Sequence, residues 1–231
     1  FRVLKRGEEL EGALGKSADQ LSDLGLRYDL TVPLTRFYAT NQSKLPKVLK
    51  AIQTGPVWRA ERPQKGRYRQ FVQCDIDIIG DDTSLAEVEI LNASLHALAA
   101  LGITTATIRV NHRELLSRSI QELGVAAKDH SRAMITIDKL DKIGIDGVCL
   151  ELKERFNEEV AAKAKTWLSG LAGKQAVPQQ LEAVFAALEL VHPGKLRFDP
   201  TLVRGMGYYT GIIFEIEHPE SGSSIGGGGR Y

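Results

Sequence analysis

The stretch VWRAERPQKGRYRQFVQCDIDIIG, residues 57–80, changes character halfway along and favours a β-hairpin. Its first half carries a set of basic side chains around a Pro–Gly turn signal: Arg59, Arg62, Lys65, Arg67 and Arg69. Its second half alternates apolar residues with carboxylates and ends at Gly80. Because residues 47–61 also alternate, we predict two long antiparallel strands joined by a charged loop. Such a loop is typical of a solvated hairpin tip, but arginine forks also suit phosphate or carboxylate oxygens.

The period of two in a strand decides which side chains of the second strand share a face. One face carries Arg69, Phe71, Gln73, Asp75 and Asp77, and the other carries Gln70, Val72, Cys74, Ile76 and Ile78. We expect the apolar face to pack against the core. On the polar face, Phe71 suits stacking on a planar base, and Gln73 and Asp77 suit hydrogen bonds to an amine or an imidazole. A solvated outer face is the alternative, although it gives no reason for Phe71.

The rest of the chain predicts a mixture of strands and helices. Strands are expected at 1–5, 26–30, 105–110, 196–198 and 209–217, and helices at 81–102, at 111–124 and from a cap at Thr31. From 125 to 193 helical patterns dominate, which indicates a helical insertion between core segments at 1–124 and 194–231. Antiparallel strand pairs with helices grouped elsewhere favour an α+β fold.

The composition is that of an ordinary globular protein. Of 231 residues, 43% are apolar and 26% are charged, and the net charge of +1 excludes nucleic-acid binding through bulk charge, though not through a local basic patch. Two distant cysteines argue against a disulfide framework and favour a reducing, cytoplasmic setting. No apolar run reaches the roughly 18 residues of a membrane-spanning helix, so we expect no membrane partner. The chain starts within an expected strand and stops at a glycine run, so we expect a fragment.

The motif LRYDLT, residues 26–31, places polar residues where a strand is expected to meet a helix. A carboxylate at Asp29 suits an ammonium group, but Asp29 and Thr31 equally suit simple capping of the helix. Phosphate-loop, GxSxG and zinc-ligand patterns do not occur, so we predict no metal ligands among the side chains. The histidines are scattered, and none is assigned a role.

The motif LVRGMGYYTG, residues 202–211, surrounds polar side chains with glycines. Gly205, Gly207 and Gly211 free the backbone around Arg204, Tyr208 and Tyr209. This pattern is typical of a close approach to a ligand, although paired tyrosines are also common packing residues. The glycine run at 226–229 is open to two interpretations, a close backbone approach or a loose loop.

Together these separated motifs resemble those of class II aminoacyl-tRNA synthetases, in the form found in histidyl-tRNA synthetases. Residues 57–80 resemble motif 2, LRYDLTVPL (26–34) resembles the first histidine-binding segment, and LVRGMGYYTGIIFE (202–215) resembles the histidine signature. GGGGRY (226–231) resembles the start of the strand that follows. The resemblance covers nearly the whole chain and implies an antiparallel catalytic sheet with flanking helices. It further implies that histidine reacts with ATP to give histidyl-adenylate and then histidyl-tRNA.

The resemblance also implies roles for individual residues. Arg59 and Arg204 would be catalytic, because they would stabilise the charge that develops at the α-phosphorus. ATP would contact Arg59, Glu61, Arg67 and Phe71, with the ring of Phe71 on adenine. Histidine would contact Asp29, Thr31, Gln73, Asp77, Arg204, Tyr208 and Tyr209. Family members often carry Glu at the position of Asp29 and an acidic residue at the position of Gly207.

Further implications concern partners and alternatives. The resemblance implies ATP with Mg²⁺, tRNA(His) as a partner, a homodimer and a cytoplasmic location. Motif 1, motif 3 and the anticodon-binding domain of the family lie outside these 231 residues, so activity of the fragment alone is an open question. A regulatory subunit of ATP phosphoribosyltransferase, which resembles the same scaffold without aminoacylation, is the alternative. A stress-kinase module that binds uncharged tRNA is a third class. The motif 2 arginine and the histidine signature favour the synthetase.

Overall fold

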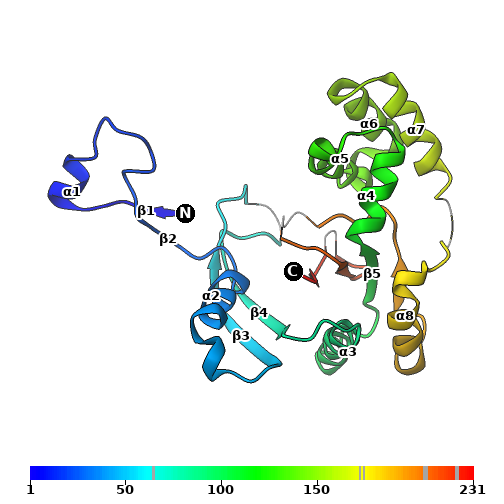
Figure 1. The fold of residues 1–231 in the computed structure, drawn as a ribbon, viewed down its shortest axis with the longest axis horizontal. Helices are drawn as coiled ribbons and strands as arrows, with labels where there is room; N and C mark the ends of the chain where they lie inside the picture. The colour runs from blue at the N-terminus through cyan, green and yellow to red at the C-terminus, as the bar shows by residue number, and fades with distance from the viewer. Residues whose placement is uncertain (64–65, 172, 174, 205–207, 222–223) are drawn as a thin grey trace. The chain divides into compact units, whose positions relative to one another are not determined.

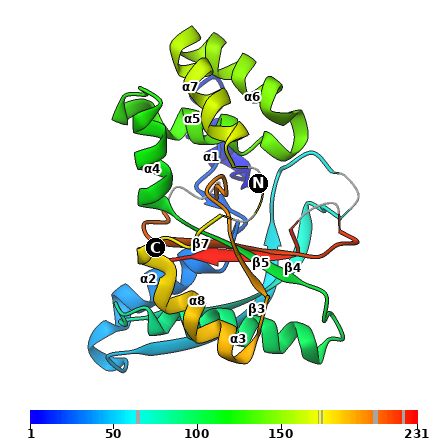
Figure 2. The same cartoon turned by 90° about the vertical axis from the view of Figure 1, so that its right-hand side faces the viewer.

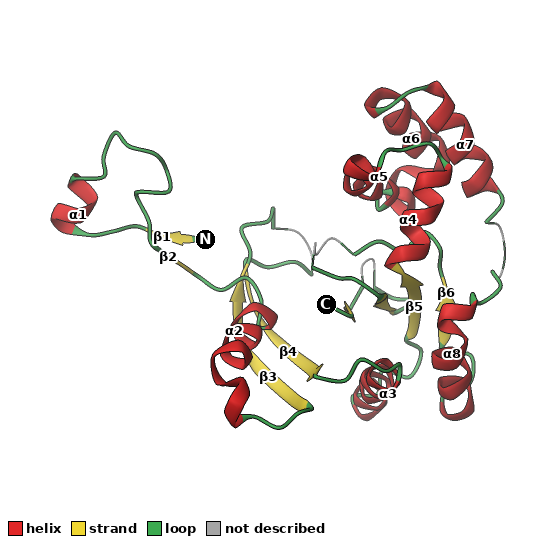
Figure 3. Ribbon diagram, viewed as in Figure 1, coloured by secondary structure: helices red, strands yellow, loops and turns green. Residues whose placement is uncertain are grey.

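The computed structural model describes residues 1–63, 66–171, 173, 175–204, 208–221 and 224–231. The chain divides into two units, Phe1–Asp82 and Thr83–Tyr231. Each unit contains both helices and strands (Figures 1 and 3). The predicted α+β class is confirmed.

The first unit is built around a long hairpin. Its elements are β1 (Arg2–Val3), α1 (Gly7–Glu11), β2 (Leu24–Gly25), α2 (Thr31–Asn41), the 3-10 helix η1 (Gln42–Lys44), β3 (Leu49–Trp58) and β4 (Gln70–Ile79). β3 and β4 pair antiparallel from Leu49 opposite Ile79 to Trp58 opposite Gln70. The predicted hairpin is therefore confirmed. It ends at Gly80, where a φ of 95° favours glycine and where an added Cβ would clash with the carbonyl oxygen of Lys47.

The segment that leads into α2 differs from the prediction. No strand forms at 26–30, and the expected cap, Thr31, is instead the first residue of the helix. The Asp29 carboxylate accepts a hydrogen bond from the backbone N–H of Val32 at 3.1 Å, so Asp29 satisfies a free donor in the first turn of the helix. Arg27 ties the segment to the end of β3, because its carbonyl accepts from the N–H of Trp58 at 2.9 Å. Because Asp29 lies within the strand expected at 26–30 and bonds the first turn of α2, the backbone leads into the helix and does not form that strand.

The polar face of the hairpin, rather than the apolar face, is the more buried one. On the apolar face Val72 is 66% exposed and Ile52 is 78% exposed, whereas Val57 on the polar face is fully buried. The cause is the approach to α2, since the Leu30 side chain lies 3.8 Å from where a Cβ of Gly55 would stand. The prediction that the apolar face of the second strand packs against the core is therefore wrong for this unit.

Within its described residues, the second unit combines a mixed sheet with six helices of more than one turn. In chain order its elements are α3 (Leu85–Ala100), β5 (Thr107–His112), α4 (Arg113–Glu122), η2 (Ala127–Asp129), α5 (His130–Ile137), α6 (Leu140–Arg155), α7 (Glu158–Ser169), α8 (Gln179–Val191), β6 (Leu196–Phe198), β7 (Ile212–Glu217) and β8 (Gly226–Gly229). The strand order is β6-β5-β7-β8. β5 pairs parallel with β6, and the other neighbours are antiparallel. The parallel pair was not predicted, because the helices between β5 and β6 make a crossover that no local pattern reveals.

Among the described residues of this unit, two large hydrophobic cores and one small one form. Helices α3 and α8 pack against the sheet through buried residues that include Leu91, Ile108, Leu188 and Phe214. Helices α4 to α7 form a separate bundle around a core of their own (Figures 1 and 2). The limits of a helical insertion at 125–193 stay a prediction, but within them α8 packs on the sheet beside α3.

Candidate functional site

Arg59 stands directly after β3, on the rigid stem of the hairpin. Its backbone N–H donates to the carbonyl of Arg69 at 2.9 Å, so strand pairing continues through it. Its guanidinium carbon lies 4.5 Å from the ring centroid of Tyr28 and 5.1 Å from that of Phe71. Within the described part of the chain, Arg59 forms no ion pair. Two aromatic rings therefore hold the cation, and its charge stays available to an anion.

Phe71 and Gln73 follow on the same face of β4. The ring of Phe71 is half-buried and lies against Arg59, which gives a physical reason for an aromatic residue on a polar face. The Oε1 atom of Gln73 is buried and has no hydrogen-bond partner among the described residues. An unsatisfied buried acceptor costs free energy, so this amide is suited to a ligand that donates a hydrogen bond.

A cluster of three carboxylates, Asp29, Asp75 and Asp77, lies on this face. Asp29 and Asp77 are buried, and Gln53 donates to Asp77 at 3.4 Å. Burial, together with the charges of Asp77 and Asp29, raises the pKa of Asp75 to about 6, while Arg59 opposes the rise. Negative charge is thus crowded beside a cation. The sequence placed Asp75 on the polar face but assigned it no role, although its position between Gln73 and Asp77 was a usable signal.

The other residues predicted to bind ATP or histidine in this unit include Glu61 and Arg67, whose side chains are more exposed. Glu61 and Arg67 approach each other to 3.9 Å with side chains that are each 48% exposed, so their ion pair contributes little to stability. Thr31 lies in the first turn of α2. Lys65 lies outside the described residues. The binding roles of Glu61, Arg67 and Thr31 stay predictions.

In the second unit, Arg204 and the tyrosines form another polar group. Arg204 Nη1 donates to Glu215 Oε1 on β7 at 2.6 Å. Tyr209 is buried in a small core with Leu202, and its ring meets that of Tyr208 edge-on at 4.9 Å between centroids. The structure therefore brings Arg204 and Tyr209 to the same strands, β7 and β8.

The glycines of this motif separate into two groups. Gly205 and Gly207, which were expected to free the backbone, lie outside the described residues. At Gly211 a Cβ would stand 3.2 Å from Cδ of Arg230, a distance at which the neighbour must give way. That arginine makes a two-pronged ion pair with Glu87 at 2.6 and 2.7 Å, and so anchors the end of β8 to α3. The space at Gly211 is therefore taken by the protein itself.

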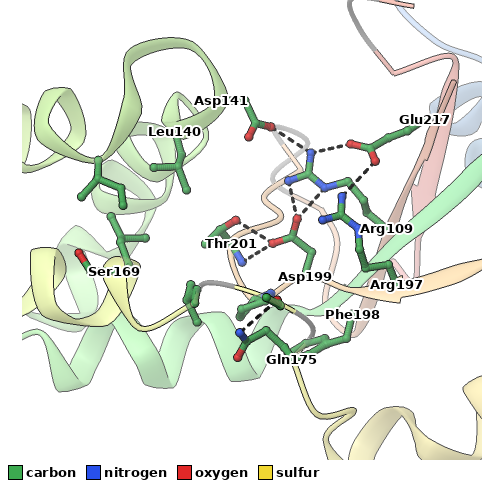
Figure 4. A pocket seen from close by; sticks show the side chains of 15 residues that line it. Arg109, Leu140, Asp141, Ser169, Gln175, Arg197, Phe198, Asp199, Thr201 and Glu217 are labelled. Atoms are coloured by element: carbon green, nitrogen blue, oxygen red, sulfur yellow. Dashed lines mark hydrogen bonds and ion pairs between the residues drawn. The ribbon is translucent and has the colours of Figure 1, made fainter. Parts of the chain in front are cut away.

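A charged cluster around Arg109 on β5 was not predicted from the sequence. Arg109 bonds Asp199 at 2.7 Å, Glu217 at 2.9 Å and Asp141 at 3.0 Å, and Glu217 also accepts from Arg197 (Figure 4). Burial alone would raise the pKa of Asp199, but Arg109 and the hydrogen bonds from Thr201 lower it. Arg109 thereby links α6 to the sheet beside a cavity of about 460 Å³. Because its donors are used within the protein, we assign this cluster to structure.

Among the described residues, no group of three or more His, Cys, Asp and Glu side chains is arranged to hold a metal ion. None of the helices in the described ranges is both long enough and apolar enough to cross a bilayer.

Similarity to known proteins agrees with the geometry of the hairpin and the sheet. The family described as Histidyl-tRNA synthetase matches residues 4–231 of the chain. The histidine--tRNA ligase of Leifsonia xyli subsp. xyli is 51% identical over the whole chain, which covers 60% of that protein. The probable histidine--tRNA ligase of Tropheryma whipplei strain Twist is 43% identical with the same coverage. The chain thus spans about 60% of the length of these relatives.

Solved structures show the same fold. The histidyl-tRNA synthetase of Nostoc sp. PCC 7120 superposes with a TM-score of 0.75 and 28% identity, over 89% of this chain and 52% of that one. A structure from Bacillus halodurans, described as an ATP phosphoribosyltransferase regulatory subunit/histidyl-tRNA synthetase, gives a TM-score of 0.71 over 89% and 57%; at 22% identity it shows the fold alone. The chain belongs to the histidyl-tRNA synthetase family.

Proposed function

We propose that this chain takes part in activating histidine with ATP to histidyl-adenylate and in transferring it to tRNA(His). Family membership and relatives named histidine--tRNA ligase support the proposal. The observation that carries it is the polar face of the hairpin. There an arginine held by two rings, without an ion pair in the described ranges, stands beside three carboxylates. Such a surface suits a phosphate group, which the arginine would bind, next to an ammonium group, which the carboxylates would bind.

The proposed activation needs no nucleophile from the protein. The histidine carboxylate attacks the α-phosphorus of ATP, a carboxylate–phosphorus bond forms, and pyrophosphate leaves with the electrons of the broken P–O bond. Charge spreads over the phosphate oxygens as this happens. Arg59 and Arg204 are the residues proposed to stabilise that charge, which is the main way a protein accelerates such a transfer.

ATP is assigned to the motif 2 residues. Phe71 would stack on adenine, with its ring already fixed against Arg59. Arg67 and Glu61 in the adjoining loop would contact the nucleotide. Mg²⁺ belongs here to the MgATP substrate, where it neutralises phosphate charge.

Histidine is assigned to the acidic face and the tyrosines. Asp29, Gln73 and Thr31 would receive the α-amino group, and the unpartnered Oε1 of Gln73 supports this assignment. Asp77, Tyr208 and Tyr209 would read the imidazole. A pocket whose polar groups expect N–H donors rejects analogues that lack them, because those groups would be left unpaired.

The partners are part of the same proposal: tRNA(His), a second copy of the protein in a homodimer, and a cytoplasmic location. We further propose that the helical insertion contacts the acceptor stem. Residues 125–193 contain nine Lys and Arg against ten Asp and Glu, so this contact would depend on local placement of cations more than on bulk charge. Crosslinking tRNA to the full-length protein tests it, and labels confined to other regions would overturn it.

Histidine-dependent exchange between pyrophosphate and ATP tests the activity. The full-length protein is expected to catalyse exchange with histidine and not with histidinol, which lacks the attacking carboxylate. Binding of histidine without exchange would instead support the regulatory-subunit alternative. No binding of histidine would overturn both.

A further inference from the structure

The side chain of Arg204 is held by two partners that the sequence did not identify. Its Nη1 donates to Glu215 Oε1 at 2.6 Å, and both side chains are only 21% exposed. The same carboxylate oxygen accepts a weak bond from Ser224 at 3.5 Å. Arg204 Nε is buried and has no hydrogen-bond partner among the described residues. A half-buried carboxylate therefore fixes one edge of the guanidinium while another donor stays unbonded.

The second partner is the glycine strand β8. Glu215 lies directly opposite Gly227 in the antiparallel pairing of β7 and β8. A Cβ at Gly227 would stand 3.0 Å from both Cζ and Nη1 of Arg204. Such distances are tighter than most real Cβ contacts, so a side chain at Gly227 would push against the guanidinium.

The other glycines of β8 follow the alternation of a strand. A Cβ at Gly229, on the same face as Gly227, would stand 2.9 Å from Cδ1 of Tyr209. On the opposite face, Gly226 meets the flexible end of Ile216 at 3.1 Å. The glycine run is thus an ordered strand, and one of its faces lies directly against Arg204 and Tyr209. This answers the question that the sequence left open, because the groups that approach this backbone closely belong to the protein itself.

From these contacts we infer that Glu215 and Gly227 are positioning residues for Arg204 in the adenylation step. The inference rests on the proposed function, in which Arg204 stabilises charge at the α-phosphate. The charge-assisted bond from Glu215 directs the guanidinium, and the bare backbone at Gly227 lets it lie flat against the strand. Without either partner, the arginine would sample several rotamers and lose the geometry that transition-state stabilisation requires.

Substitutions at Glu215 test the first partner in the full-length protein. Glu215→Ala is expected to lower kcat for histidine-dependent exchange by about tenfold, with KM for ATP changed less than about twofold, because the arginine acts on the transition state. Glu215→Gln keeps a hydrogen-bond acceptor and is expected to retain more activity than Glu215→Ala. Glu217→Gln is the matched control, since Glu217 lies two residues further along β7 and bonds Arg109 and Arg197 instead.

A double-mutant cycle separates positioning from a general structural effect. In an Arg204→Ala background, Glu215→Ala is expected to change kcat by less than about twofold, because there is no guanidinium left to position. An equal tenfold loss in both backgrounds would overturn the inference, and so would wild-type kcat in Glu215→Ala. If the wild-type protein shows no exchange at all, the proposed function fails first.

Glycine substitutions test the second partner. Gly227→Ala is expected to lower kcat by about tenfold or more, whereas Gly226→Ala is expected to stay within about twofold of wild type, because Ile216 can rotate away. A Cβ at Gly227 would also stand 2.8 Å from the Phe214 carbonyl oxygen, so the cycle with Arg204→Ala is repeated for this variant. A loss that persists in full without Arg204 would show disruption of the strand and would contradict the role of Gly227.

Discussion

Arg59 in the first unit and the pair Arg204 and Arg109 in the second are held in different ways. On the hairpin, Arg59 lies against the rings of Tyr28 and Phe71 and forms no ion pair in the described ranges. On the mixed sheet, Arg204 and Arg109 are each bonded to carboxylates. The first arrangement leaves the guanidinium without a direct ion pair in the described ranges, and the second neutralises its charge in part.

The difference teaches how to separate arginines that bind from arginines that support. A ring neighbour restricts a guanidinium without using its donors, and in Arg59 only Nε is bonded within the described ranges, to the carbonyl of Tyr28 at 3.3 Å, so an incoming phosphate meets the two Nη groups. A carboxylate neighbour fixes the guanidinium and uses donors at the same time. Arg109 is the extreme case, because three carboxylates share it. Arg204 is intermediate, with one carboxylate and an unbonded Nε.

The largest effect is expected at Arg109, whose charge is balanced by three carboxylates. Arg109→Met leaves the buried Asp199 without its main partner, so it is expected to lower the free energy of unfolding by about 3 kcal/mol. Urea unfolding of the full-length protein measures the change. Arg197→Met is the control, because that side chain is 58% exposed and should cost less than about 0.5 kcal/mol. Equal effects of the two substitutions would break the distinction between supporting and exposed pairs.

The activity should depend on the planar guanidinium of Arg59 and not only on its positive charge. Arg59→Lys keeps the charge but loses the planar fork, and it is expected to lower histidine-dependent exchange by about thirtyfold, or 2 kcal/mol. Arg62→Lys, at an exposed position that has no assigned role, serves as control. A lysine at 59 that supports the wild-type rate would show that the rings do not present a fork to the phosphate.

Removing one of the two rings sharpens the same comparison. Phe71→Leu is expected to raise KM for ATP by about tenfold, because both the stacking surface and one support of Arg59 are lost. Steady-state exchange at varied ATP measures the effect. Val72→Ala is the matched control on the opposite, exposed face of β4. An unchanged KM for ATP in Phe71→Leu would show that the ring of Phe71 does not contact ATP.

The smallest effect concerns the acid beside Arg59. Since the pKa of Asp75 is raised from 3.8 to about 6, the folded state binds a proton more tightly than the unfolded state does. The free-energy cost of ionising Asp75 in the folded state is therefore absent below about pH 3.8 and complete above about pH 6. Asp75→Asn is expected to stabilise the protein at neutral pH by about 1 kcal/mol, after allowance for solvent screening.

Thermal melting across a range of pH checks this sign. The melting temperature of Asp75→Asn relative to wild type should rise between about pH 4 and pH 6 and level off above that. A difference that is constant over this range would show that Asp75 titrates normally.

Local patterns predicted the hairpin because alternation and turn residues act over neighbouring positions. They predicted the wrong buried face, since burial depends on what covers a strand, and here Leu30 covers the polar side. Glu215 was missed because a polar residue in an alternating strand reads as ordinary, and only its pairing with Gly227 reveals its role. Arg109 offered a usable signal, a lone charge within an apolar strand. The parallel pairing of β5 with β6 needed contacts that are distant in sequence.

The central claim is that Arg59 and Arg204 each stabilise charge during activation of histidine. The most direct test is the rate of histidine-dependent ATP–pyrophosphate exchange in full-length Arg59→Ala and Arg204→Ala variants, with folding verified by circular dichroism. Each is expected to lose on the order of a hundredfold or more in rate while remaining folded. A wild-type rate in either variant would contradict the account.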